Sequence, residues 1–246
     1  MHHDHPGAAG DSSVVVIVLT GGSSRRMGRH KPALQVAGRP MVERVVDAAR
    51  PRPTVVVGSR LGVPGDIETV ADDRPGGGPV AGLAAGLRHL DDLRVDAGAD
   101  TPAPIGMRGP DAGPDVAPDA TADAAPDVTA GARRADLVIV LAGDLPFVTS
   151  AHLDRLVVAL RRDDAAAAVT ADDDGQRNWL CAVWRLAALR EQLAALGDPE
   201  GRSMRSLAGG LRVTEVGHRG EATDVDTPDE LDRARRRAAR HDARSG

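Results

Sequence analysis

The chain offers little that could stack on nucleic-acid bases, because its 246 residues include no tyrosine, one phenylalanine and two tryptophans. Proteins that bind single-stranded nucleic acid typically combine aromatic platforms with a positively charged groove. The formal net charge of −5 also disfavours a general affinity for polyanions. We therefore expect no nucleic-acid partner, and a core built from valine, leucine, isoleucine and alanine.

Cysteine and long apolar runs are equally scarce. The single cysteine, Cys181, excludes an intramolecular disulfide framework and any cysteine-rich zinc or iron–sulfur site. The first residues contain no apolar signal segment, and no stretch approaches the roughly 20 apolar residues that a membrane-spanning helix requires. We expect a cytoplasmic protein without membrane contact.

What the chain does contain is an alternation of short apolar runs with segments of helical periodicity. The runs at 14–18, 54–57 and 135–141 predict buried strands, and the segment 41–49 predicts a helix. Such alternation is typical of α/β proteins with a parallel sheet. Ligands bind to these sheets beyond the carboxyl ends of the strands. Polar residues that follow a predicted strand are therefore the first candidates for a site.

Composition divides the chain into four parts. Residues 1–12 form a polar tail, and residues 13–240 form one domain. Residues 95–134 interrupt that domain with a stretch rich in Asp, Ala, Pro, Gly and Thr, and almost no large apolar side chain there can offset the entropy of ordering. We expect a disordered insertion at 95–134 and a C-terminal tail at 241–246.

A glycine-rich, cationic loop follows the first predicted strand. Residues 19–31 read LTGGSSRRMGRHK. Glycines such as Gly21 and Gly22 let the backbone approach phosphate oxygens closely, and Arg26 and Lys31 add positive potential. The loop has neither the Gly-Lys-Ser/Thr end of a P-loop nor the G-x-G-x-x-G dinucleotide motif. We predict that it binds a nucleoside triphosphate; an ordinary strand-to-helix turn with surface charges is the alternative.

The pattern G-G-x-S-x-R-M-G-x-x-K in this loop resembles the signature of the molybdenum cofactor guanylyltransferases and their cytidylyltransferase relatives. The resemblance implies a Rossmann-like three-layer α/β/α sandwich with a mostly parallel central sheet, the nucleotidyltransferase fold. It also implies catalytic roles for Arg26, Lys31 and Asp144. The nucleotide would be bound by Leu19, Thr20, Gly21, Gly22, Lys31, Asp73, Gly82 and Asp144.

Two acidic positions suit a magnesium ion. Asp144 directly follows an apolar strand, and Mg²⁺ is usually bound by one or two carboxylates together with substrate phosphates. In the family that Gly-Asp-Leu-Pro resembles, the corresponding aspartate holds Mg²⁺; the alternative for Asp144 is a helix-capping role. Alternation along an extended segment places Asp224 and Asp226 on one side, and we favour Asp226 as the second ligand.

Base preference depends on two further positions. The resemblance gives Asp73 a nucleotide contact, with the adjacent Asp72 as competitor, and a carboxylate can accept hydrogen bonds from guanine or from a ribose hydroxyl. Guanylyltransferases resemble Leu-Ala-Gly-Gly at the start of the loop and cytidylyltransferases Leu-Ala-Ala-Gly. The Gly21 form favours GTP over CTP.

By this resemblance, the terminal phosphate of molybdenum-bound molybdopterin attacks the α-phosphorus of GTP and pyrophosphate leaves. Arg202 and Arg205 fall in the half of the chain that forms the acceptor pocket, and surface arginines beside a helix start are the alternative. GTP and molybdopterin are thus the expected substrates, and the resemblance allows a molybdoenzyme or chaperone partner. The rival interpretations are transfer from CTP or to another phosphorylated acceptor, and a nucleotide-binding module without catalysis.

Overall fold

A central sheet organises the computed structural model, which describes residues 14–21, 30–96 and 127–245. Within those residues the sheet has seven strands in the order β5-β4-β1-β6-β8-β7-β9. All neighbouring pairs are parallel except those of β8, which is antiparallel to β6 and β7. The strands are β1 (Val14–Leu19), β4 (Thr54–Val57), β5 (Glu68–Val70), β6 (Leu137–Ala142), β7 (Ala167–Ala171), β8 (Arg177–Arg185) and β9 (Val213–Gly217).

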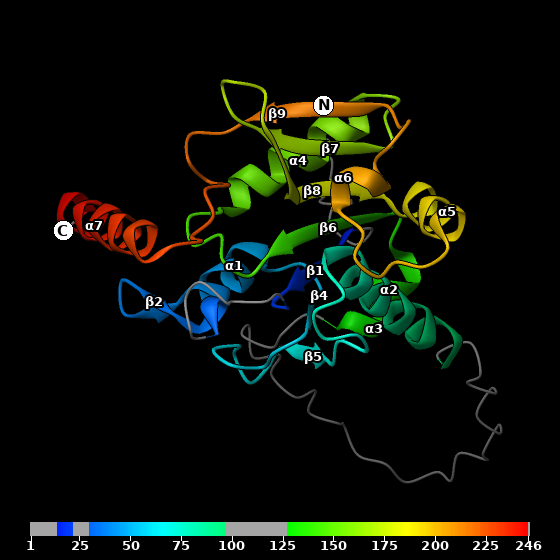
Figure 1. Ribbon diagram of the computed structural model, residues 1–246, viewed down its shortest axis with the longest axis horizontal. Helices are drawn as coiled ribbons and strands as arrows, with labels where there is room; N and C mark the ends of the chain where they lie inside the picture. The colour runs from blue at the N-terminus through cyan, green and yellow to red at the C-terminus, as the bar shows by residue number, and fades with distance from the viewer. Residues whose placement is uncertain (1–13, 22–29, 97–126, 246) are drawn as a thin grey trace, which may run out of the picture.

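Helices cover both faces of this sheet (Figure 1). The side chains of β1 alternate between two apolar clusters, since Val16 and Val18 face one cluster and Ile17 faces the other. The first cluster is covered by α1 (Met41–Ala49) and α4 (Ser150–Arg162). The second is covered by α2 (Pro79–Asp96), α3 (Val128–Arg134), α5 (Leu186–Leu196) and α6 (Met204–Leu207). The α/β/α sandwich predicted from the sequence is confirmed.

A smaller unit extends the sandwich at one side. The 3₁₀ turn η1 (Lys31–Ala33) leads into the hairpin of β2 (Gln35–Val36) and β3 (Arg39–Pro40). The long helix α7 (Pro228–Ser245) packs on this hairpin through Leu231, Ala234 and Ala238. Figure 1 shows α7 reaching out from the sheet beside β2. None of the described helices is both long and apolar enough to cross a membrane.

The segment 95–134 departs from the expected disordered insertion at both of its ends. Helix α2 continues to Asp96, and α3 occupies 128–134. Helix α3 is ordered by three contacts that its composition does not reveal: Asp127 accepts a hydrogen bond from the N–H of Thr129 at 2.8 Å, Arg94 binds the carbonyls of Ala132 and Ala135, and Gly131 packs on Pro53. Residues 97–126 lie outside the described part of the chain.

The C-terminal boundary also differs from the prediction. Instead of a tail from 241, α7 runs on to Ser245, because the sequence after Pro228 has neither glycine nor proline to stop a helix before Gly246. The predicted N-terminal tail, residues 1–12, lies outside the described residues. The structure therefore gives helical ends to two segments that composition alone marked as irregular.

Candidate functional site

The carboxyl ends of the paired strands β1 and β6 lie side by side, next to the start of η1. The N–H of Gly143, the first residue after β6, donates to the carbonyl of Leu19, the last residue of β1, at 2.9 Å. Gly143 is closely packed, because a Cβ there would lie 3.0 Å from the Thr20 methyl group and 3.2 Å from the Cβ of Pro32. Pro32 therefore packs against the carboxyl end of β6, and this contact places its neighbour, Lys31, beside Asp144.

Lys31 joins two carboxylates from distant parts of the chain. Its Nζ lies 2.5 Å from Oδ2 of Asp144, which follows β6, and it also contacts Oδ1 of Asp226, which precedes α7. The Lys31 and Asp144 side chains are 12% and 17% exposed, whereas Asp226 is 56% exposed. The structure thus brings together three residues predicted from the sequence, with the outer carboxylate open to solvent.

One ammonium does not balance the negative charge here. Burial raises the pKa of Asp144, against the opposing effect of Lys31. Burial alone would lower the pKa of Lys31, but the facing carboxylates Asp144 and Asp226 outweigh it, so that the Lys31 pKa is raised. Loss of hydration, followed by the charges of Asp226 and Asp144, raises the pKa of Asp224 to about 6. Counted over the described residues, the site keeps a surplus of negative charge, which favours the binding of another cation.

Alternation along the segment before α7 presents these acids to the site. Val225 is buried against Val36 and Met41, so Asp224 and Asp226 on either side of it point away from that small core. Glu230 accepts hydrogen bonds from the N–H groups of Asp226 and Thr227, at 2.7 and 2.8 Å. In return the Thr227 hydroxyl accepts from the N–H of Glu230, which completes a capping box and fixes where α7 begins.

The end of β1 is held close to the end of β4. The Thr20 hydroxyl is buried and lies 3.0 Å from the carbonyl of Val57 and 3.1 Å from that of Ser59. Gly58, between those two residues, has φ of +110°, and a Cβ there would come within 2.9 Å of the Gly21 nitrogen. Thr20 therefore has a structural role, and Gly58 is required by this close approach.

The neighbouring acids Asp72 and Asp73 have different surroundings. A Cβ on Gly21 would lie 3.2 Å from Oδ2 of Asp72, so the Asp72 carboxylate stands beside the first loop. The carboxylate of Asp73 instead pairs with Arg88 at 2.5 Å, and both side chains are exposed. Of the two acids between which the sequence did not decide, Asp72 is the one that lies beside Gly21, past the carboxyl end of β1.

The second half of the chain reaches the same edge through a loop. The N–H of Gly201 donates to the carbonyl of Gly77 at 2.7 Å, and Arg202 follows beside Gly78 at the start of α2. Gly82, one turn into α2, packs against Leu19. Arg205 lies on α6, where Ser203 caps the helix. The predicted residues Gly22 and Arg26 lie outside the described residues.

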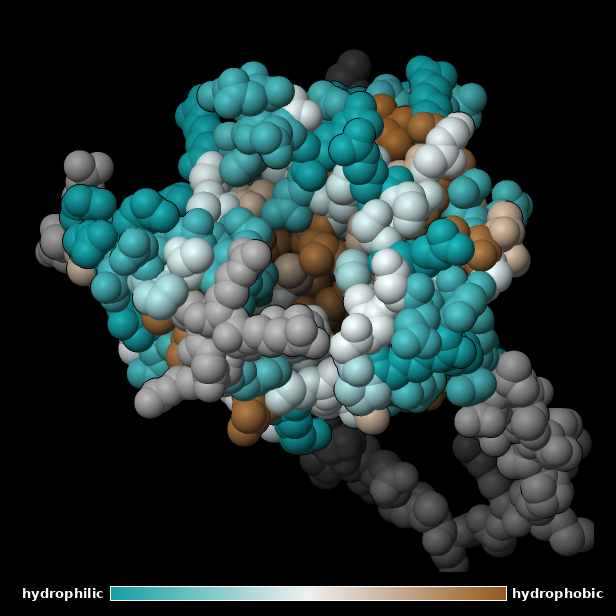
Figure 2. Space-filling model, in the orientation of Figure 1, coloured by the Kyte–Doolittle hydropathy of each residue, from teal (hydrophilic) through white to brown (hydrophobic). Residues whose placement is uncertain are grey.

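The face viewed in Figure 1 is hollowed near its centre. Figure 2 shows hydrophobic side chains on the floor of this hollow, over β6, and hydrophilic ones around its rim. An apolar floor with a few polar groups at the edge is typical of small-molecule sites. Among the described residues, no group of three or more His, Cys, Asp or Glu side chains could hold a metal ion by itself.

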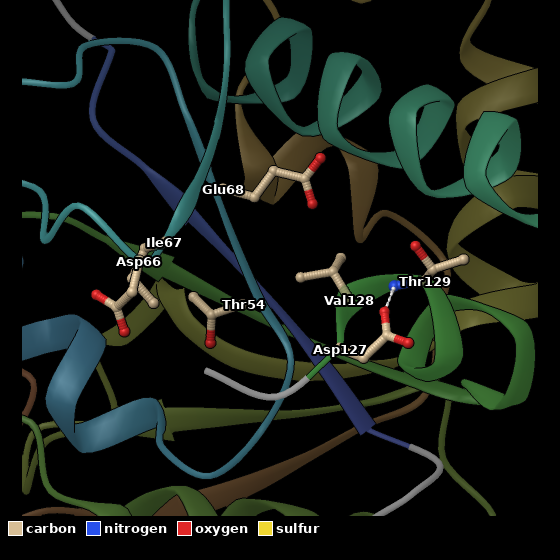
Figure 3. Close-up of a pocket in the computed structure, with 7 residues that line it drawn as sticks. All are labelled: Thr54, Asp66, Ile67, Glu68, Asp127, Val128 and Thr129. Atoms are coloured by element: carbon tan, nitrogen blue, oxygen red, sulfur yellow. Dashed lines mark hydrogen bonds between the residues drawn. The ribbon is translucent and has the colours of Figure 1, made fainter. Parts of the chain in front are cut away.

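A separate pocket of about 210 Å³ lies at the amino-terminal ends of β4 and β5 (Figure 3). It is bordered by Thr54 and Glu68, the first residues of β4 and β5, and by Asp127 at the start of α3. Its three carboxylates are already engaged, because Asp66 pairs with Arg50 at 2.5 Å, Glu68 lies 2.7 Å from the ring of His89, and Asp127 caps α3. This pocket is not part of the Lys31 site.

Comparison with known proteins identifies the family. Residues 16–213 match the model of the MobA-like NTP transferase domain. The chain belongs to this family. It is therefore a nucleotidyltransferase, as the loop signature predicted. A molybdenum cofactor guanylyltransferase of Rhodobacter capsulatus is 29% identical over 224 residues, which cover 89% of this chain and 93% of that protein. Another, from Rhizobium meliloti, is 39% identical over 82 residues, 30% of this chain and 36% of that protein.

Solved structures of MobA-like and related nucleotidyltransferases share the fold. The molybdopterin-guanine dinucleotide biosynthesis protein A of Archaeoglobus fulgidus aligns with a TM-score of 0.60 at 21% identity, over 92% of this chain and 99% of that one. The 2-C-methyl-D-erythritol 4-phosphate cytidylyltransferase of Thermus thermophilus aligns at 0.54 and 19% identity, over 92% and 98%. Structures named for different nucleotides and acceptors thus share this fold, so substrate choice depends on individual side chains.

Two polar side chains beside the Asp224–Asp226 segment were not among the site residues predicted from the sequence. Asn178, at the start of β8, binds the carbonyl of Ala222, and His152 lies fully buried under the same region. A signal for His152 was present, because it shares the apolar face of α4 with Leu156 and Leu160 at helical spacing. Nothing in the local sequence indicates the partner of Asn178, which is 44 residues away.

Proposed function

We propose that the chain transfers GMP from GTP to molybdenum-bound molybdopterin, which yields the guanine dinucleotide cofactor and pyrophosphate. The observation that carries this proposal is the meeting of Lys31, Asp144 and Asp226 at the carboxyl end of the sheet. The guanylyltransferase names of the curated relatives support the choice of substrates.

In the reaction, an oxygen of the acceptor's terminal phosphate forms a bond to the α-phosphorus of GTP. The bond from that phosphorus to the oxygen bridging to the β-phosphate breaks, and pyrophosphate carries away the negative charge. No covalent enzyme intermediate is required. The ammonium of Lys31 offsets charge that accumulates on pyrophosphate, and we assign Arg26 the same task. The backbone of Leu19 and Gly21, with Thr20 packed beneath, lets the nucleotide approach closely.

The donor set fits a magnesium ion. Family members typically require a divalent metal, and Asp144 and Asp226 offer carboxylate oxygens close enough to share one ammonium. Two carboxylates, together with substrate phosphates and water, are the usual environment of Mg²⁺ in proteins. When bound, the ion neutralises phosphate charge and orients the α-phosphate. The surplus of carboxylates around Lys31 is consistent with a site that is charge-balanced only when the cation is present.

Guanine recognition is proposed for Asp72 in place of Asp73. A carboxylate accepts the ring N–H and the exocyclic amine of guanine together, whereas cytosine presents no such pair of donors. Gly21 places no side chain against the Oδ2 atom of Asp72, whose other oxygen, Oδ1, accepts from the N–H of Arg74 at 3.0 Å. The carboxylate of Asp73 is instead paired with the exposed guanidinium of Arg88, a residue of α2.

The test is Mg²⁺-dependent pyrophosphate release with GTP or CTP, with and without molybdopterin. We expect release with GTP that requires the acceptor. Asp72→Asn should raise KM for GTP about tenfold or more, the cost of a charge-assisted hydrogen bond, while Asp73→Asn is the matched control and stays near wild type. Faster turnover with CTP would reassign the chain to cytidylyl transfer, and absence of pyrophosphate with any nucleotide would leave a binding module.

A further inference from the structure

The segment between β9 and α7 carries Asp224 and Asp226 without support from the sheet ladder. Among the described residues, 218–226 pair with no strand, and their regular backbone structure is limited to a turn at 221–222. Side chains hold it instead. Asn178 donates from Nδ2 to the carbonyl of Ala222 at 2.9 Å, and Arg237 donates to that of Gly220 at 2.9 Å. The position of the acids therefore depends on side chains that bind this segment from other elements.

Asn178 belongs at the same time to an irregularity in β8. Thr170 of β7 pairs with Asn178, but the preceding residue, Val169, pairs with Ala182, so three residues of β8 have no partner on β7. Bulges of this kind recur next to active sites, where they redirect side chains. The Oδ1 atom of Asn178 accepts from the N–H of Leu180 at 3.0 Å, and the Thr170 hydroxyl donates to the carbonyl of Cys181 at 2.8 Å.

A second route leads from this bulge through His152, which is fully buried. The Nε2 of His152 lies 2.7 Å from Oγ1 of Thr170. Because the only proton of that hydroxyl goes to Cys181, Nε2 must carry a proton and donate it to Thr170. The other ring nitrogen, Nδ1, then accepts from Arg155 at 2.7 Å, and the guanidinium of Arg155 also pairs with Glu221 at 2.9 Å.

The two routes end on adjacent residues, Glu221 and Ala222, just before Asp224. We propose that Asn178 and His152 are positioning residues that hold the Asp224–Asp226 segment in register with the β8 bulge. This inference rests on the proposed function, in which Asp226 binds the metal. Neither side chain is placed in contact with substrate; each acts through the backbone that carries the acids.

Asn178→Asp is the sharpest variant, because it keeps the shape and the oxygen that accepts from Leu180 but replaces the donor toward Ala222 with a second acceptor. We expect about tenfold weaker binding of Mn²⁺, measured by electron paramagnetic resonance with a non-hydrolysable GTP analogue present. Turnover should fall by a similar factor while KM for GTP stays unchanged, since Asp72 and Gly21 are untouched. Gln176→Glu, an exposed amide-to-acid change two residues earlier, is the matched control.

His152→Gln tests the second route. The glutamine amide still donates to Thr170 but no longer accepts from Arg155 in the same geometry, so Mn²⁺ binding should weaken severalfold even if Asn178→Asp fails to fold. A lowered melting temperature with Mn²⁺ affinity and turnover of both folded variants within about twofold of wild type overturns the inference. Wild-type protein that releases no pyrophosphate from GTP instead overturns the proposed function, which separates the two failures.

Discussion

The two carboxylates that meet at Lys31 are held in place by different means. Asp144 follows β6, whose residues are buried on both faces and paired along their length with β1 and, for most of the strand, with β8. Asp226 ends a segment that pairs with no strand among the described residues, and side chains from β8, α4 and α7 hold it. Of the two carboxylates that we propose as metal ligands, Asp144 is therefore a rigid anchor, whereas the position of Asp226, the second anchor, depends on side-chain hydrogen bonds.

Breaking the rigid anchor should affect stability more than chemistry. Ile139→Ala removes a fully buried side chain from the centre of β6, and the lost burial together with the resulting cavity should lower the free energy of unfolding by about 4 kcal/mol. Urea unfolding measures this loss. Turnover per folded molecule should stay near wild type. Val158→Ala, at an exposed position on α4, is the control and should change stability by less than about 0.5 kcal/mol.

Acid should weaken the side-chain network that holds the second anchor. Burial, and next the positive charge of Arg155, lower the pKa of His152 to about 4, with Glu221 and His218 as the other charged neighbours. The unfolded chain takes up this proton near pH 6.5 and the native protein only near pH 4. Stability is therefore complete above about pH 6.5, and up to about 3 kcal/mol is lost as the pH falls to about 4.

Chemical denaturation at a series of pH values measures this slope. His152→Gln should flatten the slope between pH 6.5 and 4, because the group that takes up the proton is gone. An unchanged slope in the folded variant would assign the acid sensitivity to other groups. The loss of stability tied to Glu221, whose pKa is lowered to about 2, belongs to a more acidic range and is expected in both proteins.

Removing the cation that joins the two anchors should reduce turnover without unfolding the chain. Lys31→Ala takes away a preorganised positive charge and should lower kcat about 10²-fold, as loss of a single transition-state donor does. Pyrophosphate release gives the rate, and thermal unfolding monitors the fold. Arg88→Ala, which deletes an exposed cation paired with Asp73, should leave the rate unchanged. Near-normal turnover of the folded Lys31→Ala protein would contradict its assignment.

The smallest expected effect distinguishes the neighbouring acids. Asp226→Asn should raise the Mg²⁺ concentration for half-maximal turnover about tenfold, because one charged ligand becomes a neutral one. Asp224→Asn should have the smaller effect, since Lys31 contacts Asp226 directly and senses Asp224 only through its charge. A larger shift for Asp224→Asn would exchange the roles of the two.

The sequence predicted the rigid anchor well and the other one poorly, for a physical reason. An apolar run that ends in Gly-Asp indicates a central strand and a polar residue at its carboxyl end, and Asp144 is found there. The Thr-x-x-Glu spacing of Thr227 and Glu230 is likewise a local capping signal, and α7 begins there. The partners of Glu221 and Ala222, by contrast, lie on α4 and β8, and no local pattern encodes contacts at such separations.

The ends of one predicted segment and the choice between two adjacent acids both depended on contacts that local sequence does not reveal. Composition predicted that 95–134 is irregular, yet α3 forms at its end. The contacts that stabilise α3 come from Arg94 and Pro53, which both lie outside that segment of the sequence. Asp72 and Asp73 are adjacent, and only their surroundings in the fold, Gly21 for one and Arg88 for the other, separate them. Local pattern gives an element's type, whereas the choice between neighbouring side chains depends on tertiary contacts.

Both tryptophans of the chain, Trp179 and Trp184, lie on β8 with ring centroids 6.0 Å apart, and there is no tyrosine. Ultraviolet-excited emission from the whole protein therefore originates at one strand, and Trp179 lies within its bulge. Changes in solvent exposure or stacking at that strand alter the emission without an added label. Changes confined to β4 and β5, on the other side of the sheet, should leave the tryptophan fluorescence nearly unchanged. The fluorescence of the unmodified protein therefore reports selectively on β8.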